Sequence, residues 1–310
     1  MAKNYINQLR ALLESAELTQ KELAQRLNVT QAALNRWLHA RAIPHPNRRL
    51  AIAALYKTLI GFKPLEVAER TRLLAKARVL RQPSLWEKIS RSTHLLEELL
   101  LEHTYNSNAI EGSTLSKKET EAVIFDKSRL SNKSLVEHLE AVNHAAVLRD
   151  IFLKKYPAVI TEKLIQQIHR ALLQGIRHDS GEYSTYQRAI RGVNIALTHP
   201  KDIPEEMHHL MMTWRRAVRR GITVADVAQF HTTFELIHPF GDGNGRVGRL
   251  ILLIQLLAAD YPPVVIENSR KAEYYEVLEY AQRQSIDPFL VFLADEMEHT
   301  AVLLKKLPKT

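Results

Sequence analysis

One segment of this 310-residue sequence constrains the fold more than any other: residues 230–260, which read FHTTFELIHPFGDGNGRVGRLILLIQLLAAD. The segment begins as an amphipathic helix that ends near Ile237, breaks at His238-Pro239 and crosses a loop with three glycines. It then enters a helix that is apolar almost all round, and such a helix belongs in the centre of a bundle. The sequence therefore predicts a helical bundle whose central helix begins at a glycine-rich loop.

The rest of the chain favours the same all-α class. It has only 10 glycines, and apolar residues recur at spacings of three and four in one segment after another. One such stripe is expected to be the buried face of a helix, and its members are Leu135, Leu139, Val142, Ala146, Leu148, Ile151 and Phe152. Breaks fall at residues 61–64, 82–84 and 261–263, because proline disfavours a helical residue before it.

Residues 183–198 are the exception to the helical pattern. Val193, Ile195 and Leu197 occupy alternate positions, and Gly192 lies where a hairpin could turn. We therefore expect a small two-stranded β-hairpin flap.

Composition excludes several classes of protein. The chain has no cysteine, which removes disulfides, thiolate metal sites and cysteine nucleophiles. No apolar run approaches the roughly 18 residues that span a bilayer, and the N-terminus lacks the apolar core of a secretory signal. We expect a cytoplasmic protein with no membrane partner.

Charge is distributed unevenly along the chain. The formal net charge is +9, but residues 1–90 hold 16 Lys/Arg against 6 Asp/Glu, whereas residues 91–310 hold 27 against 28. A basic unit joined to a near-neutral body indicates a polyanion-binding module, although a solvated cationic face kept for solubility would have the same composition. We expect a domain at 1–63, connecting helices at 64–98 and a larger helical domain at 99–305.

Two short helices are predicted within the basic unit. Thr19 with Glu22 forms a capping-box pattern for the first helix, and Thr30 can cap the second after a turn at Asn28-Val29. This stretch resembles the helix-turn-helix of the phage-repressor (Cro/C1-like) family from about Leu9 to Leu59. The resemblance implies a dimer bound to DNA, with base or phosphate contacts from Gln20, Gln31, Asn35 and Arg36. A module that serves only for dimerisation or docking is the alternative.

The glycine-rich loop carries residues suited to phosphate chemistry. The N-terminus of the following helix directs free N–H groups into the loop, and Gly243 and Gly245 permit backbone amides to face an anion. Arg246 and Arg249 share one helix face and can bind further phosphate oxygens. Asp242 can hold a divalent ion, Mg²⁺ being the ion expected, and His238 is the one group here that exchanges a proton near neutrality.

The run HPFGDGNGRVGR resembles the Fic family signature HPFx(D/E)GN(G/K)RxxR at every position, and the resemblance extends over residues 99–300. The family implies transfer of AMP from ATP to a protein hydroxyl with release of pyrophosphate. His238 would then deprotonate the target, Phe240 would anchor the loop, and Asp242 would bind Mg²⁺. The nucleotide phosphates would lie against a set of loop and helix residues: Gly243, Asn244, Gly245, Arg246 and Arg249.

Residues 107–112, within TYNSNAIEGSTLS, resemble the Fic inhibitory motif (S/T)xxxE(G/N) at Ser107, Glu111 and Gly112. Without the catalytic signature, Glu111-Gly112 would be interpreted as a helix end with a solvated acid. The resemblance implies that Glu111 forms a bidentate pair with Arg249 and takes the donors that a γ-phosphate would use.

The resemblance also implies sites for the target and for the base. A target segment would add as a strand along the flap 183–198, at Arg191, Val193 and Ile195. Where relatives have Gly-x-Tyr-Arg this chain has GEYS at 181–184, and Arg188 or Arg191 could replace the missing arginine. Tyr275, in a segment with Arg270 and Tyr274, offers an aromatic face to adenine. Gln282 stands where many relatives have Asn.

Together these features predict an adenylyltransferase that Glu111 inhibits. It would modify Ser, Thr or Tyr of a target protein, and that target could be the enzyme itself. Two alternatives remain open from the sequence. One is a Fic-type enzyme that uses another nucleotide or phosphate donor. The other is a nucleotide-sensing transcriptional regulator without transferase activity.

Overall fold

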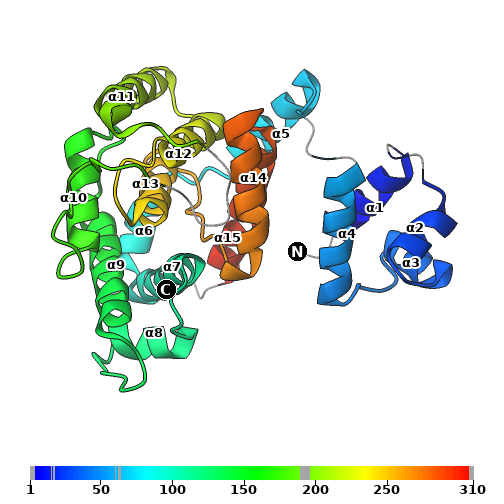
Figure 1. The fold of residues 1–310 in the computed structure, drawn as a ribbon, viewed down its shortest axis with the longest axis horizontal. Helices are drawn as coiled ribbons and strands as arrows, with labels where there is room; N and C mark the ends of the chain where they lie inside the picture. The colour runs from blue at the N-terminus through cyan, green and yellow to red at the C-terminus, as the bar shows by residue number, and fades with distance from the viewer. Residues whose placement is uncertain are drawn as a thin grey trace. The chain divides into compact units, whose positions relative to one another are not determined.

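The computed structural model describes residues 4–14, 16, 18–59, 61, 64–188 and 196–306. It separates into two compact units, of which the first ends at Pro64 and the second begins at Leu65. The described residues form fifteen α-helices and two short 3₁₀ helices, with no strand among them (Figure 1). The expected all-α class is confirmed.

The first unit is a four-helix bundle of α1 (Asn4–Glu14), α2 (Gln20–Arg26), α3 (Gln31–Leu38) and α4 (Pro46–Leu59). Thr19 and Glu22 form the predicted capping box at the start of α2, and the Ala33 N–H donates to Thr30 Oγ1 at the start of α3 (3.2 Å). Asn28 makes the turn between them with φ of 50°. The helix-turn-helix surrounds a core that includes Leu9, Leu23, Leu34 and Ile52.

The second unit holds the remaining helices. They are α5 (Val67–Val79), α6 (Leu85–Arg91), α7 (Thr93–Glu111), α8 (Lys117–Ile124), α9 (Leu135–Lys154), α10 (Glu162–Leu172), η1 (Pro200–Asp202), α11 (Ile203–Arg220), α12 (Val224–Ile237), α13 (Asn244–Ala258), η2 (Asn268–Arg270), α14 (Lys271–Arg283) and α15 (Asp287–Lys306). α5 and α6 belong to this unit, and α7 runs unbroken through residue 98, where the sequence suggested a boundary.

The centre of the second unit is α13, and α6, α7, α10 and α12 contact it (Figure 1). Every residue from Arg246 to Leu257 is buried, as the apolar pattern predicts. A helix buried on all sides has both ends fixed by its neighbours. Its N-terminus, and the loop before it, are therefore held in one place.

The expected buried face of α9 is confirmed at Leu148, Ile151 and Phe152, but it is wrong for three of the four residues before them. Leu135 is 73% exposed and Val142 is 45% exposed, and Ala146 is also exposed. α9 packs against α7 through another face, which includes the buried His144. His144 Nδ1 lies 3.1 Å from Thr104 Oγ1 of α7, so this face of α9 also carries a buried polar contact.

The predicted hairpin flap lies mostly outside the described residues. Residues 189–195 are among those not described, so the expected turn at Gly192 and the docking positions Arg191, Val193 and Ile195 stay predictions. Among the helices in the described part of the chain, none combines the length and hydropathy required to cross a bilayer.

Candidate active site

The loop between α12 and α13 is closed by one side chain. The Phe240 N–H donates to Asn244 Oδ1 (2.9 Å), and Asn244 Nδ2 donates back to the Phe240 carbonyl (2.8 Å). Both polar atoms of the Asn244 amide are therefore engaged by the backbone. We expect Asn244 to hold the α-phosphate together with the amides of Gly243 and Gly245, and its side chain also closes the loop that would carry this phosphate.

Phe240 is fully buried and stacks on His169 of α10, with ring centroids 3.8 Å apart and planes at 6°. His169 Nε2–H donates to the Asp242 carbonyl (3.0 Å), and the Gly181 N–H donates to His169 Nδ1 (2.7 Å). Burial lowers the pKa of His169 to about 4, so the neutral ring serves both bonds. The sequence analysis missed His169, although a histidine on the inner face of an amphipathic helix was a signal for such a role.

The start of α13 forms an anion site. Gly243 precedes the helix with φ of 76°, a left-handed conformation that glycine adopts without strain. The N–H groups of the first helical turn, from Asn244 to Arg246, have no carbonyl partner within the helix. These amides and the positive end of the helix dipole suit a phosphate.

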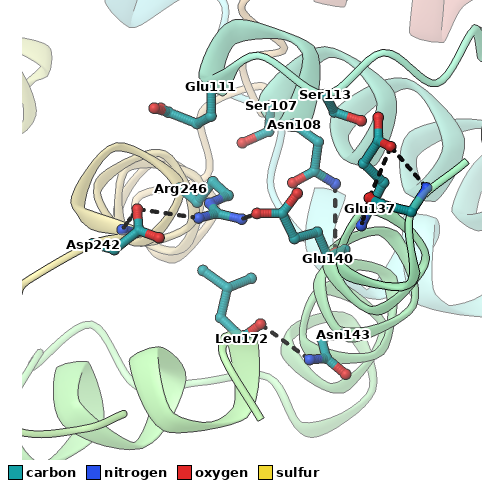
Figure 2. A network of polar contacts seen from close by, with 12 residues as sticks. Ser107, Asn108, Glu111, Ser113, Glu137, Glu140, Asn143, Leu172, Asp242 and Arg246 are labelled. Carbon is teal, nitrogen blue, oxygen red and sulfur yellow. Dashed lines mark hydrogen bonds and ion pairs between the residues drawn. The ribbon is translucent and has the colours of Figure 1, made fainter. Parts of the chain in front are cut away.

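Arg246 lies between two carboxylates. Its Nη1 donates to Glu140 of α9 (2.5 Å), and its Nη2 lies 3.5 Å from Asp242 Oδ1 (Figure 2). The guanidinium is buried and its Nε has no hydrogen-bond partner. Glu140 was not identified from the sequence, because only the packing of α9 on the loop brings it here.

Arg249 joins the central helix to the end of α7. Its Nε donates to Ser107 Oγ (3.0 Å), and its Nη2 donates to the Ser107 carbonyl (2.9 Å) and to Glu111 Oε1 (2.7 Å). Burial alone would lower the pKa of Arg249, but the neighbouring Glu111 and two tyrosines raise it above its ordinary value. The guanidinium therefore stays charged although it is buried.

The pair between Glu111 and Arg249 is made by one hydrogen bond rather than the two that we expected. Arg249 Nη1 has no hydrogen-bond partner. The Glu111 carboxylate lies against the first turn of α13, where a Cβ on Gly245 would collide with Glu111 Oε1. The absence of a side chain at residue 245 thus admits the acid to the anion site.

His238 ends α12 in a left-handed conformation, with φ of 50°. Its Nδ1 lies 3.3 Å from the Glu235 carbonyl, which can only accept, so the ring proton belongs on Nδ1 and the Nε2 lone pair is free. Burial lowers the pKa of His238 to about 4. At neutral pH the ring is therefore an unprotonated base.

A cavity of about 430 Å³, open to solvent, extends from His238 and Arg249 to α14. Tyr275 and Gln282 line it, as expected of a base pocket, and Gln282 Nε2 has no hydrogen-bond partner. Tyr274 also lines it, but its hydroxyl is engaged by His231 Nε2 (2.8 Å). Arg270 instead pairs with Glu273 and Glu296, which makes it a structural residue.

The Asp242 carboxylate suits a metal ion that arrives with a nucleotide. Its side chain is 51% exposed, at the start of the helix that forms the anion site. Within the described ranges, no group of three or more His, Asp or Glu residues could hold an ion unaided. Mg²⁺ commonly takes one or two carboxylates and completes its shell with phosphate oxygens and water, and Asp242 fits this mode.

The ends of the flap approach the loop. The Ser184 N–H donates to the Pro239 carbonyl (2.8 Å), and Arg188 Nη2 donates to the Thr198 carbonyl (2.5 Å). Arg188 is buried, and its Nε and Nη1 have no hydrogen-bond partner. It therefore links the two described sides of the flap and retains donors for an anion.

In the first unit, the expected DNA-contacting residues lie on α2 and α3. Gln31 and Arg36 are exposed, and Gln20 and Asn35 are partly exposed. The buried side of α3 is formed by Leu34, Trp37 and Leu38. Among the described residues of the first unit, the outer side of α3 is exposed or partly exposed at Gln31, Asn35 and Arg36.

Fold and site together define an all-helical domain with an anion-binding loop at the N-terminus of its central helix, preceded by a helix-turn-helix unit. Residues 159–256 match the protein family described as Fic/DOC family, and residues 9–60 match the family described as Helix-turn-helix. The second unit therefore contains a Fic/DOC domain, and the first unit contains a helix-turn-helix domain.

Relatives and solved structures that resemble this chain are also Fic proteins. A protein adenylyltransferase Fic from Aedes aegypti is 32% identical over 209 residues, which are 66% of this chain and 41% of the relative. The corresponding protein of Nematostella vectensis is 29% identical over 271 residues, 79% of this chain and 62% of its own. The chain thus spans 41% and 62% of the length of these two curated relatives, less than two thirds in each case.

Among solved structures, a Fic domain containing signaling protein from Bacteroides thetaiotaomicron is 26% identical with a TM-score of 0.62, over 75% of this chain and 95% of that one. Fic-1 from C. elegans shares the fold, at 23% identity and a TM-score of 0.65, over 95% of this chain and 86% of that one.

Proposed function

We propose that the protein transfers AMP from ATP to a hydroxyl side chain of a target protein, and that Glu111 restrains this activity. The observation that carries the proposal is the single cavity shared by His238, Gly245, Arg249 and Tyr275. It brings together an unprotonated base, a helix N-terminus, a buried guanidinium and an aromatic ring. The relatives named adenylyltransferase support the same reaction.

In the proposed reaction, the target hydroxyl passes its proton to His238 Nε2, and its oxygen attacks the α-phosphorus. The new O–P bond forms as the bond to the β-phosphate oxygen breaks, and pyrophosphate leaves with that electron pair. The amides of the first turn of α13 hold the α-phosphate, and Arg246 and Arg249 neutralise the β- and γ-phosphates. Mg²⁺ bound at Asp242 would supply further neutralisation of phosphate charge.

Inhibition by Glu111 follows from charge competition. The carboxylate occupies Arg249 Nη2 and the space over Gly245, which a triphosphate would otherwise use. Since Ser107 holds Arg249 by two further bonds, the guanidinium is fixed in the position that Glu111 reaches. ATP then binds with its γ-phosphate displaced.

The test uses the full chain with Glu111→Gly, incubated with α-labelled ATP and cell lysate, followed by mass spectrometry of the labelled proteins. We expect a mass increase of one AMP that His238→Ala abolishes while ATP binding is retained. An added mass of another nucleotide or of phosphate alone would favour the other donors. DNA binding that depends on ATP, without modification of any protein, would favour the alternative of a nucleotide-sensing transcriptional regulator.

We further propose that the first unit binds DNA as a dimer. Residues 1–64 carry 10 Lys/Arg against 3 Asp/Glu, and phosphate neutralisation supplies most of the non-specific affinity for DNA. A two-fold DNA site matches a pair of recognition helices. Analytical ultracentrifugation with and without a DNA duplex tests it, and a monomer in both conditions would contradict it.

A further inference from the structure

Glu235 is a buried carboxyl group in the middle of the site with no role in the reaction described so far. It lies in the last turn of α12, is 3% exposed, and lines the same cavity as His238 and Arg249. Its Oε1 has no hydrogen-bond partner. A buried polar group without a partner is destabilising, so the presence of this carboxyl group requires an explanation.

The central helix leaves room for this carboxyl group. A Cβ on Gly248 of α13 would collide with Glu235 Oε1. Any residue other than glycine at position 248 would therefore displace the carboxyl group from the cavity.

The carboxyl group lies on the side of His238 opposite to the reacting nitrogen. Glu235 Oε2 is 3.8 Å from His238 Nδ1, and the Glu235 carbonyl is 3.3 Å from the same atom. Both acceptors of one residue thus approach Nδ1. Catalytic hydrogen bonds are often long without substrate and shorten in the reacting complex.

We propose that Glu235 is a positioning residue for His238, whose carboxylate stabilises the imidazolium that forms when Nε2 takes the proton of the target hydroxyl. The inference rests on the proposed transfer of AMP. The proton of the hydroxyl resides on Nε2 during the transfer and then leaves to solvent, while Nδ1–H points to Glu235 throughout.

The charges around Glu235 determine when it ionises. Arg249 faces it from α13, Glu111 from α7, and Tyr274 and Tyr275 from α14. Burial raises the pKa of Glu235 to about 8, Arg249 opposes the rise, and the negative charge of Glu111 adds to it. Removal of Glu111 therefore lowers the pKa of Glu235 and favours the carboxylate beside His238.

The charged groups around His238 leave its ring neutral over the pH range in which Glu235 titrates. Arg188 lowers the pKa of the ring, whereas Glu111 and Asp242 raise it, and burial is the largest influence. The imidazole stays neutral above about pH 4, so a step between pH 6 and 9 that Glu235→Gln removes belongs to Glu235 rather than to His238.

A kinetic experiment compares Glu111→Gly with Glu111→Gly combined with Glu235→Gln. The first should show kcat rising with pH through an apparent pKa below 8, and the second should lose this step and at least tenfold in kcat. The Kd of ATP should stay within twofold, and the melting temperatures should agree. Glu121→Gln, on the exposed face of α8, is the control. Equal pH profiles with and without Glu235 would overturn the proposal.

A second measurement does not depend on turnover. In ¹⁵N-histidine spectra of the full chain, the Nδ1 shift of His238 should follow a step near pH 8 that is lost in Glu235→Gln. His238→Asn assigns the signal. An Nδ1 shift that is flat from pH 6 to 9 overturns the inference. A clear step in a protein that transfers no nucleotide supports the contact and contradicts the proposed function instead.

Discussion

Arg249 Nη2 of α13 donates a 2.7 Å hydrogen bond to Glu111 Oε1 of α7, across 138 positions of sequence. Since the same guanidinium is needed for a triphosphate, Glu111→Gly should raise automodification by at least tenfold. Residue 111 is the last of its helix, so the glycine costs little helix stability. Incorporation of labelled AMP measures the effect, and Glu97→Ala, at an exposed position of α7, is the control. Equal labelling of both variants would contradict inhibition by Glu111.

Asn244→Ala should destabilise the protein before any nucleotide binds. It leaves the Phe240 N–H and carbonyl without partners inside the loop, a loss of about 2 kcal/mol or more. Denaturant unfolding without ATP measures this loss. Asn244→Asp keeps an acceptor for the Phe240 N–H, so its stability should lie between that of Asn244→Ala and that of the wild type. Unchanged stability with weakened ATP binding would instead indicate that the side chain holds the phosphate.

These two cases show how far the sequence could predict the site. The shared position of His238, Arg249 and Glu111 could be predicted because each belongs to a contiguous motif, and the structure places all three around one cavity. The loop-closing hydrogen bonds of Asn244 were not predicted, because residue types alone do not distinguish a loop that closes on itself from one that binds a ligand.

Residues that reach the loop from other helices were not predicted. Glu140 of α9 and His169 of α10 lie 106 and 73 positions from their partners Arg246 and Asp242. Their roles exist only after the helices pack. The fold is easier to predict from the sequence, because the burial of α13 follows from its apolar composition. The exposed Leu135 shows that an apolar stripe alone does not determine which face of a helix is buried.

The second unit should lose stability as pH falls from 6.5 towards 4. Burial lowers the pKa of His103 and His231 to about 3 and that of His169 and His238 to about 4, and His144 is lowered further. In this window the unfolded chain binds protons that the folded chain excludes, so acid favours unfolding by up to about 1.4 kcal/mol per pH unit for each group.

Two buried acids act in the opposite direction. Burial raises the pKa of Glu235 to about 8 and of Glu296 to about 7, so the folded chain holds protons there that the unfolded chain releases above about pH 4.5. Five histidines outweigh two glutamates. Chemical unfolding at a series of pH values should show that the free energy of unfolding falls as the pH falls. His103→Leu should make this pH dependence less steep, whereas His208→Gln, on the exposed face of α11, should leave it unchanged. Stability that is constant from pH 6.5 to 4.5 would contradict the burial of neutral rings.

Arg36→Ala should weaken binding of the full chain to duplex DNA and reduce the salt dependence of that binding. Arg36 is exposed on α3, the second helix of the helix-turn-helix, and removal of one phosphate contact lowers the slope of log K against log salt by about 1. Fluorescence anisotropy over a salt series measures the slope. Arg10→Ala removes an equal charge from the exposed side of α1 and should leave the slope unchanged. Equal effects of the two substitutions would mean that net charge, rather than insertion of α3, accounts for the affinity.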